Sequence, residues 1–146
     1  MANKDLRDWI NELEAAGQLQ HVSGADHHEE IGAIVDIHMH KMTNPAVMFD
    51  DIPGFPKGTR VLANILTSVP RINIALGKPI DTTEIELVNY WREYMKDQPT
   101  HTPIEVNGGP LIENVFEGDD IDIMKIPAPK WHELDGGYFI GTACMV

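Results

Sequence analysis

The sequence predicts an α/β (or α+β) fold, in which helices and short strands alternate over the first hundred residues. Apolar residues recur at helical spacing in several stretches, and short apolar runs separate these stretches. Proline or glycine marks most of the boundaries between them. The chain has 146 residues, of which 42% are hydrophobic, so it is long enough and apolar enough to enclose a core.

The first helix is expected to begin at Asn3 or Asp5, because either side chain can cap the free N–H groups of a first turn. An apolar stripe follows at helical spacing and comprises Leu6, Trp9, Ile10 and Leu13. Gly17 is typical of a residue that ends a helix. Residues 18–22 are then expected to form a short strand.

The second helix is expected after Asp26-His27-His28-Glu29, which resembles a capping box with Asp26 in place of the usual Ser or Thr. Its predicted apolar face comprises Ile31, Ile34, Val35, His38 and Met42. Asn44-Pro45 ends this helix. Strands are expected at 46–49 and 61–65, on either side of a turn-rich connection at 50–58.

Two further helices are expected before residue 99. Ser68 would cap the first, whose early proline is tolerated there and whose predicted apolar side is Ile72, Ala75 and Leu76. Gly77-Lys78-Pro79 stops it. The second has a box-like start at Asp81-Thr82-Thr83-Glu84 and a stripe of Ile85, Val88, Trp91 and Met95.

Residues 99–110 hold three prolines and two glycines, which predicts a hinge and a domain boundary. We therefore expect an N-terminal α/β domain at 1–100 and a second, incomplete domain at 101–146. Strands are predicted at 111–116 and 138–146, with an acidic turn between them. The last strand still runs at the final residue without a partner, which predicts that the chain is the N-terminal piece of a longer polypeptide.

The charge balance excludes one class of partner. The net charge is −12, from 23 acidic and 11 basic residues, and no basic patch that could bind nucleic acid is present. The single cysteine, Cys144, cannot form an intramolecular disulfide and is expected to be a packed apolar residue, so a reducing, cytoplasmic setting is predicted. No apolar run is long enough for a signal core or a membrane span, so no membrane association is expected.

The histidines and acidic residues give weak site signals. Adjacent His27 and His28, and His38 and His40 two apart, point to different faces of a helix, which disfavours a shared metal ion. His38 is expected to be a hydrogen-bonded core or interface residue. The acidic run from Glu113 to Asp122 lacks the central glycine and closing glutamate of a calcium loop, so a solvated turn is expected.

Asp135-Gly136-Gly137 allows two interpretations. The glycines permit positive φ and close approach of the backbone to a ligand or strand, or they form an ordinary tight turn. The sequence contains no phosphate-binding glycine loop and no nucleophile elbow. The residues alone therefore predict a fold but not a reaction.

Segments along the whole chain resemble, in order, the N-terminal region of the UbiD family, the prenylated-FMN-dependent decarboxylases. An I-P-x-P…D-G-G-x-[YF]-I stretch with its acidic turn, here at 119–140, is the last of them, and its I-P-A-P variant is similar to that of the aromatic and hydroxybenzoate-type members. The other segments are Asp5-Leu6-Arg7-Asp8-Trp9-Ile10, Glu14-Ala15-Ala16-Gly17, Glu30-Ile31-Gly32-Ala33-Ile34, Pro45-Ala46-Val47-Met48-Phe49-Asp50-Asp51-Ile52-Pro53-Gly54, Arg60-Val61-Leu62-Ala63-Asn64, and Val69, Arg71 and Ala75-Leu76-Gly77.

This resemblance implies a reversible, non-oxidative carboxy-lyase that acts on a small aromatic or α,β-unsaturated acid through prenylated FMN with manganese and potassium. It also implies that residues 101–146 begin a split-β-barrel-like flavin-binding domain. The family's metal ligands and acid–base residues lie after the D-G-G strand, so no catalytic or metal-binding residue is expected here. The 146-residue chain alone is expected to be inactive and to bind no cofactor. The resemblance places Thr142, and less firmly Ile140, beside the substrate pocket.

The alternative is a non-catalytic assembly or binding subunit that docks onto a catalytic partner chain. The two hypotheses differ in whether the reading frame continues past Val146. The resemblance further implies a homo-oligomer, whose contacts lie in large part in later domains.

Overall fold

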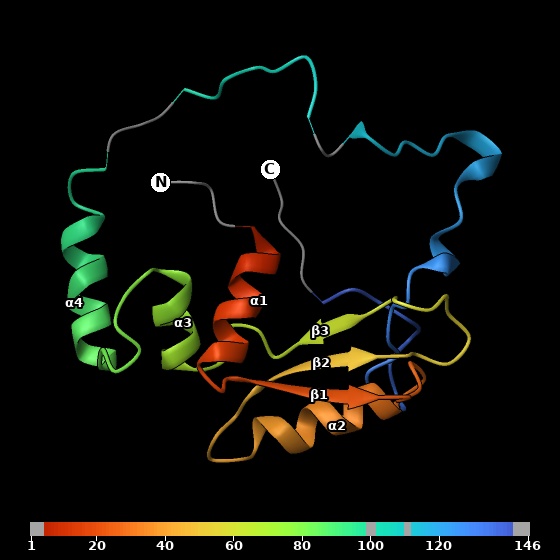
Figure 1. Ribbon diagram of the computed structural model, residues 1–146, viewed down its shortest axis with the longest axis horizontal. Coiled ribbons are helices and arrows are strands. Elements are labelled where there is room, and N and C mark those ends of the chain that lie inside the picture. The colour runs from red at the N-terminus through yellow and green to blue at the C-terminus, as the bar shows by residue number, and fades with distance from the viewer. Residues whose placement is uncertain (1–4, 99–101, 110–111, 142–146) are drawn as a thin grey trace.

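The computed structural model describes residues 5–98, 102–109 and 112–141, and its mixture of helices with a small sheet confirms the predicted α/β class (Figure 1). The helices and strands are, in order, α1 (Leu6–Ala15), β1 (Leu19–Ser23), α2 (Glu30–Met39), β2 (Ala46–Asp50), β3 (Val61–Ala63), α3 (Val69–Ala75) and α4 (Glu84–Tyr94). Two short 3-10 helices, Gly118–Asp120 and Ile123–Lys125, follow them. In this part of the chain, no helix has the length and apolar character needed to cross a membrane.

The three strands form one sheet in the order β1-β2-β3. β1 pairs with β2 in parallel, with Leu19 opposite Ala46, and β2 pairs with β3 antiparallel, with Val47 opposite Ala63. β2 is central, and its first four residues are buried because both faces of the sheet are covered. α2 lies along one face, and α1 lies on the other side (Figure 1).

The core lies between β2 and α2. Val47 and Phe49 pack in one cluster with Ile31 and Val35 of α2. Met48 alternates with them along the strand and faces the α1 side. Further members of the cluster are Ala63 of β3 and, from the connections around the sheet, Ala25 and Ile52, with Trp131 packed against the cluster from the far end of the chain.

The predicted end of the first helix and one of its two proposed caps are confirmed. The Asp5 carboxylate accepts hydrogen bonds from the amides of Arg7 and Asp8, at 2.8 and 3.0 Å, and Gly17 has φ +65°. The predicted stripe is partly wrong, since Leu13 is fully buried whereas Leu6 at the solvent end is 59% exposed.

The predicted capping box before α2 is shifted. The Asp26 carboxylate accepts from the His28 amide at 2.7 Å, but in the reciprocal bond the Asp26 amide donates to the carboxylate of Glu30, not to that of Glu29. Glu29 instead has left-handed backbone geometry with φ +72°. Met42 was expected on the α2 face, but it lies past the helix end and is fully exposed.

The predicted apolar sides of the next two helices are wrong. In α3 the buried residues are Arg71 and Asn73, because their side chains bond backbone carbonyls of neighbouring loops. The capping box at the start of α4 pairs Thr83 with Glu86, so it begins two residues later than the predicted box at Asp81. The α4 stripe is 38–65% exposed, since α4 buries only Leu87; the stripe residues are Ile85, Val88, Trp91 and Met95.

The strands predicted near the C-terminus are not observed in the described residues. Residues 112–116 contain no strand, and residues 138–141 are extended or bent without a ladder, because no strand of the described chain lies beside them. Thr142 and Cys144 lie outside the described residues. Neither Gly136 nor Gly137 has a positive φ, and a Cβ on either would meet nothing within 4 Å among the described residues, so neither position requires glycine for its backbone geometry or for a close approach there.

Candidate functional site

An apolar groove with a volume of about 290 Å³ opens between the N-terminal layer and the last described segment. Ile140, which the sequence placed beside a substrate pocket, lines it and is 60% exposed. The rest of the wall comes from the connection before α2, the loop after β2, and two stretches near the C-terminus. These residues are His27, Phe55, Ile123, Met124, Ile126, Ala128, Tyr138 and Phe139.

The His27 ring forms the inner end of the groove. It stacks on Tyr138 with ring centroids 5.0 Å apart and an interplanar angle of 20°. It meets the Phe55 ring edge-on at 4.9 Å and 86°. These are the preferred offset-stacked and edge-to-face arrangements of aromatic pairs. The three rings therefore brace one another and form a firm apolar wall.

Polar atoms behind this wall fix its position. The Tyr138 hydroxyl lies 2.9 Å from Nδ1 of His28. Nδ1 of His27 lies 3.4 Å from the Asp26 carboxylate without forming a hydrogen bond to it, and it has no hydrogen-bond partner in the described chain. The groove therefore offers apolar surface and one imidazole edge.

One ion pair lies beside the groove. The Lys130 ammonium is 2.7 Å from the Glu29 carboxylate and donates to the backbone carbonyl of Glu133 at 2.8 Å. The hydrogen bond to Glu29 raises the pKa of Lys130, and the same bond lowers the pKa of Glu29. Both groups therefore stay charged near neutral pH and are not suited to exchange protons there.

The I-P-A-P segment lines the groove through Ile126 and Ala128, and its two prolines are buried. Pro127 and Pro129 are buried, and the Phe139 amide donates to the Pro129 carbonyl at 3.1 Å. The indole N–H of Trp131 donates to the Phe139 carbonyl at 3.2 Å. Residues 129–139 thus form a closed loop that presents Tyr138, Phe139 and Ile140 to the groove.

The described residues hold no cluster of three or more His, Cys, Asp or Glu side chains that could bind a metal ion. The prediction for His38 is confirmed: it is 5% exposed, and its ring nitrogens lie 2.7 Å from the Ile34 carbonyl and 3.0 Å from the Gln20 side chain. The acidic turn is solvent-exposed, as predicted.

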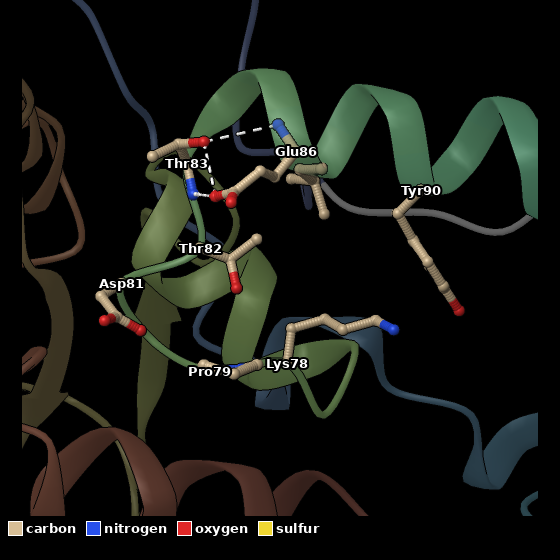
Figure 2. Close-up of a pocket in the computed structure, with 8 residues that line it drawn as sticks. Lys78, Pro79, Asp81, Thr82, Thr83, Glu86 and Tyr90 are labelled. Carbon is tan, nitrogen blue, oxygen red and sulfur yellow. Dashed lines mark hydrogen bonds between the residues drawn. The ribbon is translucent and has the colours of Figure 1, made fainter.

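A second, wider pocket of about 580 Å³ lies at the start of α4 (Figure 2). Two of its charged groups, Lys78 and Glu86, already have partners. The Lys78 ammonium lies 3.5 Å above the centre of the Tyr90 ring, and the Glu86 carboxylate accepts from the Thr83 amide and hydroxyl at 2.9 and 2.7 Å. The bonds from Thr83 lower the pKa of Glu86. This pocket therefore supports the helix start and offers no acid–base pair.

Sequence patterns missed most of the groove. Thr142 is outside the described residues, so of the two predicted site residues only Ile140 is placed. Phe55 carried a signal, since it is an aromatic residue between two prolines in a loop. His27 and Tyr138 are far apart in sequence, and only the tertiary contact brings them together.

Two family models match the chain. Residues 10–91 match the N-terminal domain of 3-octaprenyl-4-hydroxybenzoate carboxy-lyase, and residues 104–146 match its Rift-related domain. The chain is 31% identical to the pyrrole-2-carboxylic acid decarboxylase of Pseudomonas aeruginosa, over 94% of this chain and 29% of that protein. It is 30% identical to a phenolic acid decarboxylase of a Streptomyces species, over 100% of this chain and 31% of that protein.

Solved structures agree with these matches. The vanillic acid decarboxylase of Sedimentibacter hydroxybenzoicus has TM-scores of 0.77 in its open form and 0.79 in its closed form, at 28% and 27% identity. Each comparison covers 94% of this chain and 30% or 29% of the other. The chain thus spans about three tenths of the length of these relatives. Since the first family model alone covers more than half of its 146 residues, this chain belongs to the UbiD family of 3-octaprenyl-4-hydroxybenzoate carboxy-lyases.

Proposed function

We propose that this chain is the N-terminal part of a cytoplasmic, reversible, non-oxidative carboxy-lyase that acts on an aromatic or α,β-unsaturated acid through prenylated FMN. The observation that carries the proposal is the match of one chain to both family domains. Relatives named for pyrrole-2-carboxylic, phenolic and vanillic acids support an aromatic substrate. A division of the chain near residue 100, into 1–100 and 101–146, is part of the proposal and is supported by the gap between the two matches.

We further propose that the groove, with Ile140 and Thr142, contributes an apolar wall to the substrate pocket. Its volume of about 290 Å³ lies at the lower end of small-molecule sites, which run from about 300 Å³ upwards, and suits a one-ring acid. Its aromatic lining favours a planar ring over a charged group. No Lys or Arg lines it, so recognition of the substrate carboxylate is assigned to another part of the enzyme.

The described residues do not fit the phosphate and manganese that accompany the cofactor in the family. They offer neither a metal-binding cluster nor a basic side chain in the groove. Prenylated FMN supplies an electron sink for decarboxylation. The proposed contribution of this chain is to exclude water and to hold the substrate ring, and no reaction step is assigned to its side chains.

A second candidate is a non-catalytic subunit that docks onto a catalytic partner chain. The exposed stripe of α4 favours it, because Trp91 and Met95 are residue types enriched in protein interfaces. A homo-oligomer of the complete enzyme would use the same kind of surface.

The test is to express the full reading frame together with a source of prenylated FMN. Carbon dioxide release is then measured with benzoate, hydroxybenzoates, cinnamate and pyrrole-2-carboxylate, beside the 146-residue chain as control. We expect turnover only with the full frame, and no flavin absorbance on the short chain. Inactivity of a cofactor-loaded full frame on every acid would contradict the enzyme hypothesis. A stop codon after Val146 would favour the subunit.

A further inference from the structure

The start of α2 and the segment after the linker are joined through their backbones. The Lys130 amide donates to the His27 carbonyl at 2.9 Å, and the Glu29 amide donates to the Lys130 carbonyl at 2.9 Å. His28 and Lys130 thereby form an isolated parallel bridge. Residues about a hundred positions apart in sequence are held in fixed register at this joint.

Side chains reinforce this joint on both sides. The Lys130 ammonium, on a side chain only 16% exposed, is paired with Glu29 at 2.7 Å. Nε2 of His132 lies 3.2 Å from the Asp36 carboxylate on α2. Trp131, between them, packs against the core of the N-terminal layer. The contacts therefore extend along two turns of α2.

Gly32 allows the closest of these contacts. A Cβ at this position would lie 1.8 Å from the Trp131 carbonyl oxygen and 2.6 Å from its carbon, so any other residue would displace the segment. Glycine is among the poorest helix formers, yet it stands inside α2 where the segment crosses. Glu29 is equally unfavourable locally, because it adopts φ +72° without being glycine. Two locally unfavourable residues stand at one contact, which is where a functional or strained site is expected.

We propose that Gly32 and the Glu29–Lys130 pair are positioning residues, which hold the groove wall of Tyr138 to Ile140 against α2 as one rigid unit. The loop at 129–139 transmits this position, because Phe139 is bonded to both Pro129 and Trp131. The positioning of substrate rests on the proposed function, whereas the rigid joint does not.

Amide exchange on the 146-residue chain tests the joint directly. Gly32→Ala should speed exchange of the Lys130 and Glu29 amides by about tenfold or more, because both bonds cross the joint. The Val35 amide inside α2 should exchange no faster, since alanine is a better helix former than glycine. Gly109→Ala is the matched control, because a Cβ there meets nothing within 4 Å. Unchanged exchange at Lys130 in Gly32→Ala would overturn the proposal.

Turnover by the full-length enzyme tests the positioning role. Gly32→Ala and Lys130→Met should each lower kcat/KM by about tenfold, and Lys130→Arg should restore most of it, because Arg keeps the charge opposite Glu29. Normal kcat/KM together with faster exchange would make the joint merely structural. Absence of decarboxylation in the unmodified enzyme would contradict the proposed function and, with it, the positioning role. The amide-exchange data would still show whether the joint is rigid.

Discussion

The guanidinium of Arg71 on α3 donates a hydrogen bond to the backbone carbonyl of Asn44, in the turn before β2. Its Nε donates to the Ile65 carbonyl at 3.0 Å, and Nη2 donates to the Thr67 hydroxyl at 2.7 Å. The side chain is completely buried, and burial lowers its pKa. All three of these acceptors are neutral oxygens, so Arg71 fastens two loop segments, the turn before β2 and the loop between β3 and α3, to its helix without an acidic partner.

Arg71→Met should therefore destabilise the chain by about 3 kcal/mol or more, because it leaves buried acceptors without a donor. Arg71→Lys should recover little, since one ammonium cannot reproduce the planar fork of donors. Urea unfolding measures both. Exposed Arg60 is the control, and Arg60→Met should change stability by no more than about 0.5 kcal/mol. Equal effects at the two positions would contradict the structural role of Arg71.

This network explains why the core of α3 was mispredicted. Periodicity identifies apolar faces, and it assigned Ile72, Ala75 and Leu76 to the interior. Arginine is among the residues least often fully buried, so the pattern gave no reason to place Arg71 there. Buried Arg71 depends on acceptors from two loops, and the carbonyl of Asn44 is 27 residues away along the sequence, outside any local window.

The α4 prediction failed for a different reason. The stripe from Ile85 to Met95 is truly apolar, as predicted, but it faces outward. Helical spacing shows that a face is apolar and does not show what covers it. By contrast, β2 was predicted at 46–49, because a short apolar run bounded by turn residues favours a buried strand, whereas the sheet order was not predicted.

The groove could be predicted only at Ile140. The position of its C-terminal wall depends on the contact between Gly32 and Trp131, which joins α2 to the segment after the linker. Besides Phe55, a local signal was Gly32, a glycine inside a predicted helix, which usually has a packing or functional reason.

His21 should make stability depend on pH. Its Nδ1 lies 2.7 Å from the Asp50 carboxylate and its Nε2 lies 3.2 Å from that of Glu14. Hydrogen bonds to Asp50, and then to Glu14, raise its pKa above the ordinary 6.5. Because the pKa of His21 is higher in the folded state than in the unfolded chain, protonated His21 stabilises the fold. This stabilisation is complete below pH 6.5 and is lost as pH rises through the folded-state pKa.

His21→Gln should therefore lower the urea midpoint at pH 5.5 and have little effect at pH 9. The difference should be small, because the side chain is 44% exposed to solvent. A decrease in the urea midpoint that is the same at both pH values, or larger at high pH, would show that His21 does not stabilise the fold through its charge.

Thr83→Ala should loosen α4 specifically. The Thr83 hydroxyl accepts from the Glu86 amide, and the Glu86 carboxylate accepts from the Thr83 amide (Figure 2). Loss of such a cap costs about 1 kcal/mol. Faster amide exchange confined to α4 is the expected result. Thr82→Ala is the control, since the Thr82 backbone carbonyl, not its side chain, accepts the bond from Asn73; an equal response in α4 would contradict a cap at Thr83.

The proposed role of Ile140 in the substrate pocket can be tested against a control residue of equal solvent exposure. Ile140 and Ile112 are 60% and 59% exposed in this structure, and only Ile140 lines the groove. Replacing either with alanine should therefore change the melting temperature of the 146-residue chain by the same small amount. In the full-length enzyme, Ile140→Ala should lower kcat/KM by about tenfold or more, because lost apolar contact weakens the hold on the substrate ring. Ile112→Ala should leave kcat/KM unchanged, and a similar loss in both variants would remove Ile140 from the site.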